Sequence, residues 1–157
     1  TGFLSSCVLP SRMPLMQISG EAMKRDILFK AKCLGNGEWI EGWYYQKPNP
    51  LTRNGEPIRH FISNCPPFAS EIDPETVCQY TGLKDKEGRR IFEGDIISAH
   101  LDEKNPDDET INFVKWSGFG WCSVQPGFDP DPISDFDIGL WMVVGNIHDN
   151  PELIERK

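Results

Sequence analysis

The sequence predicts an all-β fold built mainly from antiparallel strands. Thirteen prolines and fourteen glycines divide the chain into short apolar runs, a spacing typical of many short strands rather than long helices. Hydrophobic residues make up 38% of the chain and aromatic residues 11%, enough to bury a core, so global disorder is excluded. Hairpins that alternate with loops and return strands favour closed or nearly closed antiparallel barrels.

We expect two small barrel-like β units with one or two short helical turns. The N-terminal unit spans residues 23–65, and the C-terminal unit spans residues 66–157, with the boundary in the stretch 63–75. Neither half is rich enough in apolar residues to stand alone, so the units are expected to share a core. Residues 1–22 are expected to be a native extension, the product of an earlier start codon, or vector-derived sequence. They lack the basic start and the length of a signal peptide.

The N-terminal unit begins with a predicted hairpin. Ile27–Cys33 forms its first strand, Gly35–Gly37 its turn, and Glu38–Tyr45 its return strand, in which aromatic side chains alternate onto both faces. Residues 46–56 are expected to form a loop, because their prolines cannot donate to a continuous ladder. A short strand, Ile58–Ser63, follows and is broken by the next two prolines.

A dense motif at Thr76–Ile97 organises the rest of the chain. A helical turn leads into it, with Asp73 as the N-cap and Pro74 in the first helical position. The motif then turns at residues 85–88, where Asp85 can accept backbone hydrogen bonds and Gly88 can adopt a positive φ without steric cost. The expected elements are strands at 80–83, 89–92 and 96–101, with a bend at Glu93-Gly94.

The C-terminal part contains one more hairpin and the most apolar strand. Thr110–Trp116 and Gly120–Gln125 pair around a tip at residues 117–119, and Ile138–Ile147 forms a buried strand. The acidic, proline-containing stretches 102–109 and 126–137 are expected to be solvated loops. A helical turn at Glu152–Glu155 closes the chain.

Three segments resemble the YopX-like proteins of bacteriophages and prophages. The first is Arg25–Phe29 continuing through Gly37-Glu38-Trp39, the second is the central motif, and the third is Val144–Ile147 continuing through Asn150–Leu153. They occur in the same order and cover roughly residues 23–157. The resemblance implies two small β units and a phage or prophage origin. It implies no established activity.

The net charge of −8 is unevenly distributed. Residues 23–60 carry seven Lys/Arg and four Asp/Glu, whereas residues 98–157 carry four Lys/Arg and twelve Asp/Glu. An acidic surface gains nothing from the release of phosphate counterions, so nucleic-acid binding is not the expected role. The chain has no apolar stretch long enough to span a membrane. The simplest interpretation of the acidic half is solubility.

The cysteines and histidines indicate neither a disulfide framework nor a metal site. The chain has five cysteines and three histidines without a C-x-x-C pair, so we expect reduced thiols, no metal and no cofactor. No nucleophile elbow or phosphate-binding loop is present. Glu93 and Asp95 are the only acids fixed in a tight motif, and we interpret them as shaping a turn. We therefore expect no catalytic residue and no enzymatic activity.

The aromatic residues remain as the functional signal. Five tryptophans exceed what so small a core needs, and tryptophan is enriched at interfaces. Trp39 and Trp141 are expected inside, and the candidate binding residues are Trp116, Phe119 and Trp121.

These observations predict a non-catalytic protein-interaction module acting in the cytoplasm of the bacterial host. Its partner is another protein or a second copy of the chain, with no membrane contact and no small-molecule ligand. The alternative is a nucleic-acid accessory protein, since small β-barrels hold single strands on aromatic side chains in a basic groove. A variant of this alternative is an acidic decoy that occupies a DNA-binding protein.

Overall fold

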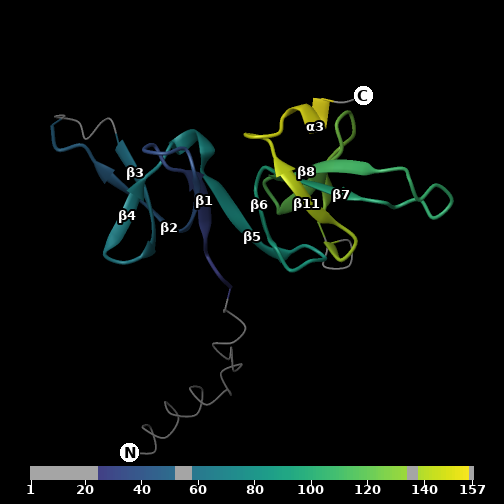
Figure 1. Cartoon of the computed structure of the whole chain (residues 1–157), viewed down its shortest axis with the longest axis horizontal. Coiled ribbons are helices and arrows are strands. Elements are labelled where there is room, and N and C mark those ends of the chain that lie inside the picture. The colour runs from purple at the N-terminus through teal and green to yellow at the C-terminus, as the bar shows by residue number, and fades with distance from the viewer. Residues whose placement is uncertain (1–24, 52–57, 134–137, 156–157) are drawn as a thin grey trace, which may run out of the picture.

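The computed structural model describes residues 25–51, 58–133 and 138–155, and within them the strands form two antiparallel sheets (Figure 1). The first sheet has six strands in the order β4-β3-β2-β1-β5-β6. Their bounds are β1 Phe29–Lys32, β2 Trp39–Pro48, β3 Ile58–Cys65, β4 Phe68–Glu71, β5 Cys78–Lys84 and β6 Arg90–Phe92. The expected antiparallel all-β fold is confirmed.

The second sheet has five strands in the order β10-β9-β8-β7-β11. Their bounds are β7 Asp95–Ala99, β8 Thr110–Trp116, β9 Trp121–Val124, β10 Asp131–Pro132 and β11 Met142–Asn146. Two short helices accompany the sheets, the 3-10 helix η2 (Pro74–Thr76) and α3 (Glu152–Glu155). None of the described helices has the length and apolarity to cross a membrane.

The central motif crosses from one sheet to the other. Its strands β5 and β6 form an edge of the first sheet, and β7 follows at once in the second. Figure 1 shows β5 and β6 running from the first sheet toward the strands of the second. The turn between β5 and β6 is the predicted one, with Gly88 at φ +81°. Asp73 caps η2 by accepting from the Glu75 amide, as predicted.

The two sheets share part of their core. Ile91 of β6 and Leu83 of β5 pack in the same apolar cluster as Ile97 and Val114 of the second sheet. A separate cluster around Ile62 lies within the first sheet. The division into units at 23–65 and 66–157 stays a prediction, because pairing within sheets does not define folding units. In the structure β4, which follows residue 65, pairs with β3.

Three expected elements differ from the structure. Ile138–Trp141 is not the start of the last strand but a turn, closed by the Trp141 amide donating to the Ile138 carbonyl at 3.2 Å. Both side chains enter the core, and residues three apart share a side in a helical turn but not in a strand. The expected loop 126–137 contains β10, which pairs with β9. Strand β2 continues to Pro48, its terminal residue, where the missing N–H costs least.

Residues 1–22, expected to be an extension, lie outside the described residues. Cys33, Cys65, Cys78 and Cys122 are free thiols in the described part of the chain, and the fifth, Cys7, lies outside it.

Candidate interaction site

The β8–β9 hairpin carries the three aromatic residues that the sequence singles out. Phe119 stands at its tip and is 102% exposed, and Trp116 at the end of β8 is 51% exposed. Trp121 is half-buried and packs on the core cluster of the second sheet. Trp116 and Trp121 are paired across the strands and meet edge to face, with ring centroids 5.0 Å apart. The structure thus presents Trp116 and Phe119 to solvent, and it packs Trp121 against Trp116 and the core.

The tip of this hairpin is a tight turn held by several bonds. The Ser117 amide donates to the Gly120 carbonyl at 3.0 Å, and Gly118 adopts φ +87°, which is accessible mainly to glycine. The Cys122 thiol donates to the Ser117 hydroxyl at 3.0 Å. Phe119 is therefore presented on an ordered turn, which reduces the entropy lost when it docks against a partner.

The Glu93–Asp95 turn connects the two sheets through buried charge. Asp95 is 1% exposed. Its carboxylate accepts hydrogen bonds from the Lys30 ammonium of β1 at 2.5 Å and from the Phe92 amide at 2.8 Å. Burial raises the pKa of Asp95 against the opposing attraction of Lys30. Gly94, at φ +80°, donates to Val114 of β8 and accepts from the Ile147 amide. This segment shapes the predicted turn, and its Lys30–Asp95 pair also connects β1 to β7.

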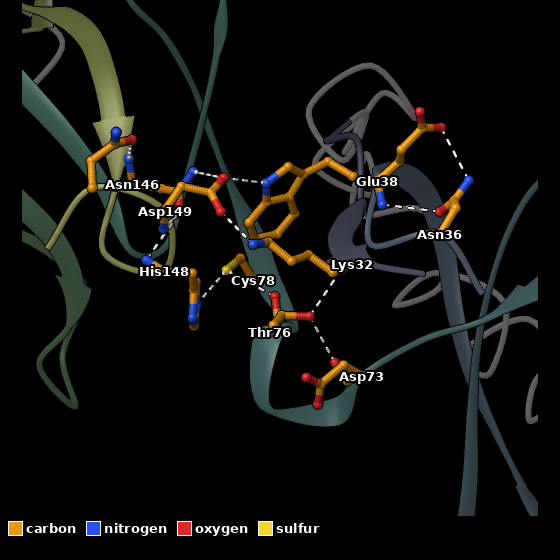
Figure 2. Close-up of polar contacts among 11 residues, drawn as sticks. Lys32, Asn36, Glu38, Asp73, Thr76, Cys78, Asn146, His148 and Asp149 are labelled. Atoms are coloured by element: carbon orange, nitrogen blue, oxygen red, sulfur yellow. Dashed lines mark hydrogen bonds and ion pairs between the residues drawn. The ribbon is translucent and has the colours of Figure 1, made fainter. Parts of the chain in front are cut away.

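A second set of polar contacts joins the C-terminal segment to the first sheet (Figure 2). Asp149 follows β11 and accepts from the Lys32 ammonium and, at 2.7 Å, from the Trp39 indole N–H. These two bonds, together with a third from Asn146 Nδ2, lower the pKa of Asp149 to about 2 although partial burial opposes them. Lys30 and Lys32 also lie over the Trp39 ring. Trp39, expected inside, is half-buried at this contact, whereas Trp141 is buried as expected.

The same region contains a cysteine beside a histidine. The Cys78 sulfur lies 3.7 Å from His148 Nε2, and Figure 2 shows the two side chains facing each other. Burial raises the pKa of the Cys78 thiol to about 12 despite the positive charge of Lys30. The attacking species in cysteine catalysis is the thiolate, so this pair is not an activated nucleophile. Cys78 instead donates to the Thr76 carbonyl at 3.2 Å.

A basic cleft of about 480 Å³ opens beside the Lys30–Asp95 pair. Its cationic lining residues are Lys30, Lys84, Arg89 and Arg90. Three of them already meet carboxylates: Lys30 meets Asp95, Arg89 meets Asp85 and Glu87, and Arg90 meets Glu41. Its one aromatic residue, Phe92, is 1% exposed. The cleft therefore offers little free positive charge and no open ring on which a base could stack.

The described residues contain no group of three or more His, Cys, Asp or Glu side chains that could hold a metal ion. The fold and the β8–β9 hairpin define a two-sheet, all-β protein that exposes aromatic side chains on a hairpin of its second sheet. The family model described as YopX protein matches residues 29–155. The chain therefore belongs to the YopX protein family.

A solved structure supports the fold. The chain is similar to the crystal structure of protein EF1440 from Enterococcus faecalis, with 24% sequence identity and a TM-score of 0.52. The similarity covers 83% of this chain and 99% of the other. Because the identity is low, this likeness concerns the fold alone. No curated protein matches the chain.

Proposed function

We propose that this protein is a non-catalytic interaction module, encoded by a phage or prophage and acting in the cytoplasm of the bacterial host. The aromatic surface formed by Trp116 and Phe119 on the β8–β9 hairpin is its binding surface. The complete exposure of Phe119 on an ordered turn carries the proposal. A rigid aromatic side chain buries a large area on docking and loses little conformational freedom.

The occupant of this surface is a second copy of the chain. Lys115 is the only charged side chain between residues 110 and 125, although the protein carries a net charge of −8. Two copies that approach through their acidic loops repel one another, whereas the hairpin surface has almost no charge to oppose contact. An isologous dimer requires a patch that is complementary to itself, and a nearly uncharged aromatic surface meets that requirement.

The residues that most resemble a catalytic site, a Cys–His pair and two buried carboxylates, support a non-catalytic role. Cys78 and His148 lie within contact distance, but the high pKa of the buried thiol keeps it protonated at neutral pH. Asp85 and Asp95 are buried, and each carboxylate accepts hydrogen bonds both within its own turn and from a distant strand. Neither carboxylate is free to accept a proton from a substrate.

Sedimentation velocity from micromolar to several hundred micromolar concentration tests the proposal. The wild-type protein is expected to shift from monomer to dimer across this range, and Phe119→Ser is expected to remain a monomer. The matched control is Phe68→Ser, since Phe68 is 73% exposed but lies at the edge strand of the first sheet. A wild-type protein that stays monomeric throughout refutes self-association. Equal dimerisation of Phe119→Ser and wild type places the interface elsewhere.

The nucleic-acid alternative receives less support, because the cations of the basic cleft are largely paired. Fluorescence anisotropy with a labelled single-stranded oligonucleotide addresses it directly. We expect no salt-dependent binding at physiological ionic strength. Binding that weakens steeply with added salt and is lost in Lys84→Ala favours the nucleic-acid role instead.

A further inference from the structure

The second sheet lines a cavity of about 410 Å³ that is partly open to solvent and separate from the aromatic hairpin tip. It lies among β7, β8, β9, β10 and the turn that precedes β11. Its apolar walls include Ile97, Ile133 and Trp141, and its polar lining includes Asn112, Ser123 and Asp131. A volume of this order is in the range of pockets for small molecules.

One buried side chain in the cavity lining has an unmet hydrogen-bonding requirement. Asn112 is 7% exposed, and its Oδ1 has no hydrogen-bond partner in the described part of the chain. Its Nδ2 donates to the Ser123 hydroxyl across the hairpin at 3.3 Å. Buried polar atoms are nearly always paired, because leaving one unpaired costs its desolvation. Asn112 lines the cavity, and its buried Oδ1 lacks a partner, so a molecule bound there could supply the donor once the side-chain amide turns its oxygen toward the cavity.

We propose that this cavity binds a small, uncharged or cationic molecule that has an N–H donor and a flat apolar body. The donor pairs with the Asn112 side chain, whose terminal torsion is broad enough to turn its acceptor toward a ligand. The apolar body lies against the wall that includes Ile97 and Trp141.

The charges around the cavity explain the expected selectivity. Asp131 is the charged residue of the lining among the described residues, and it is exposed at the rim. No lysine, arginine or histidine of the described chain lines the cavity. An anionic ligand would meet an acceptor and a carboxylate without a compensating cation, so it is disfavoured. This inference uses other residues than the proposed dimer surface and stands independently of it.

Three probes of one shape and different charge test the proposal: benzamidine, benzamide and benzoate. NMR titration of the full chain follows the Asn112 side-chain amide and the Trp141 indole N–H. Benzamide and benzamidine are expected to shift both signals saturably in the millimolar range, which is usual for probes of this size. Benzoate is expected to bind at least about ten-fold more weakly.

Two variants and a control assign the binding to this cavity. Asn112→Leu is expected to weaken benzamide binding by at least about ten-fold, since the acceptor is replaced by hydrocarbon of similar size. Asn105→Leu, in the exposed loop between β7 and β8, is the matched control and is expected to bind as wild type. Asp131→Asn, on the exposed rim, is expected to weaken benzamidine but not benzamide, and this readout does not depend on a core substitution.

Three results would overturn the inference. If none of the probes shifts the Asn112 and Trp141 signals saturably, the cavity holds water only. Equal affinity of wild type and Asn112→Leu for benzamide places the binding elsewhere. Benzoate binding as tight as that of benzamidine contradicts the charge argument.

Discussion

Replacing the buried carboxylate at the central turn is expected to destabilise both sheets. The Asp85 side chain has no exposed surface. One of its oxygens accepts from the Glu87 and Arg89 amides, both at 2.9 Å. The other accepts from Arg89 Nε at 3.1 Å and from the Val143 amide of β11 at 3.0 Å. Burial by itself would raise the pKa of Asp85, but the hydrogen bonds from Val143, Arg89 and Glu87 outweigh it, and the pKa lies below its ordinary value.

The magnitude follows from the geometry of Asp85→Asn. An amide has one acceptor oxygen, so whichever way it faces, two of the four hydrogen bonds become contacts between donors. At about 1–2 kcal/mol for each such loss, the free energy of unfolding should fall by about 2–4 kcal/mol. Asp102→Asn makes the same chemical change at an exposed turn carboxylate that accepts from the Lys104 amide. That control is expected to stay within about 0.5 kcal/mol of wild type.

Urea denaturation at neutral pH, followed by tryptophan fluorescence, measures these differences. Amide hydrogen exchange gives a second, local readout, because the Val143 amide loses its acceptor and is expected to exchange faster in Asp85→Asn. Equal unfolding free energies for Asp85→Asn and Asp102→Asn would refute the reasoning. An unchanged Val143 exchange rate would refute the claim that Asp85 connects the turn to β11.

Three further predictions concern glycines and acid stability. Gly88→Val should lower the free energy of unfolding by about 1–2 kcal/mol or more, because φ is +81° and a side chain with a Cβ is strained there. Steric contact does not add to this cost, since the added Cβ meets no atom within 4 Å. An unchanged melting temperature contradicts this prediction. Gly42→Ala should be more damaging than Gly88→Ala, since its Cβ would lie 2.3 Å from the Ser63 carbonyl oxygen, and thermal unfolding compares the two. Asp149 has its pKa lowered from 3.8 to about 2, so its stabilising contribution is present above its unfolded value and is lost as pH falls through that range. Asp149→Asn should therefore have a lower free energy of unfolding than wild type at neutral pH. Its free energy of unfolding should fall less than that of wild type as the pH is lowered from 3.8 to about 2. An equal fall for the two proteins would count against the prediction.

The candidate site was predictable in part. Phe119 and Trp116 are exposed on a hairpin that the sequence predicts, because the alternation of residues 110–116 and the Ser-Gly-Phe tip specify strand and turn locally. The half-burial of Trp121 depends on the cluster it packs against, which includes residues of the first sheet. The cavity beside Asn112 had no sequence signal at all. Its walls come from four strands and a turn, and a single asparagine in a strand does not reveal whether its amide finds a partner.

The sequence by itself determined the elements whose causes are local. The Asp85–Gly88 turn, the Asp73 cap, the β8–β9 hairpin and the final helix α3 follow from residues within a few positions of one another. Turn chemistry and strand alternation act over such distances, and each can be recognised in one stretch of chain.

The tertiary structure decided what joins the two sheets. Lys30 meets Asp95 across 65 residues, the Val143 amide meets Asp85 across 58, and Lys32 meets Asp149 across 117. In the sequence Asp85 and Asp95 stand out only as turn residues, and nothing local to Lys30 or Lys32 indicates a partner. The buried carboxylates of Asp85 and Asp95 must find an opposite charge or a hydrogen-bond partner because they are removed from water, whereas Lys32 and Asp149 meet at a partly exposed contact. Which partner lies within reach depends on the path of the whole backbone.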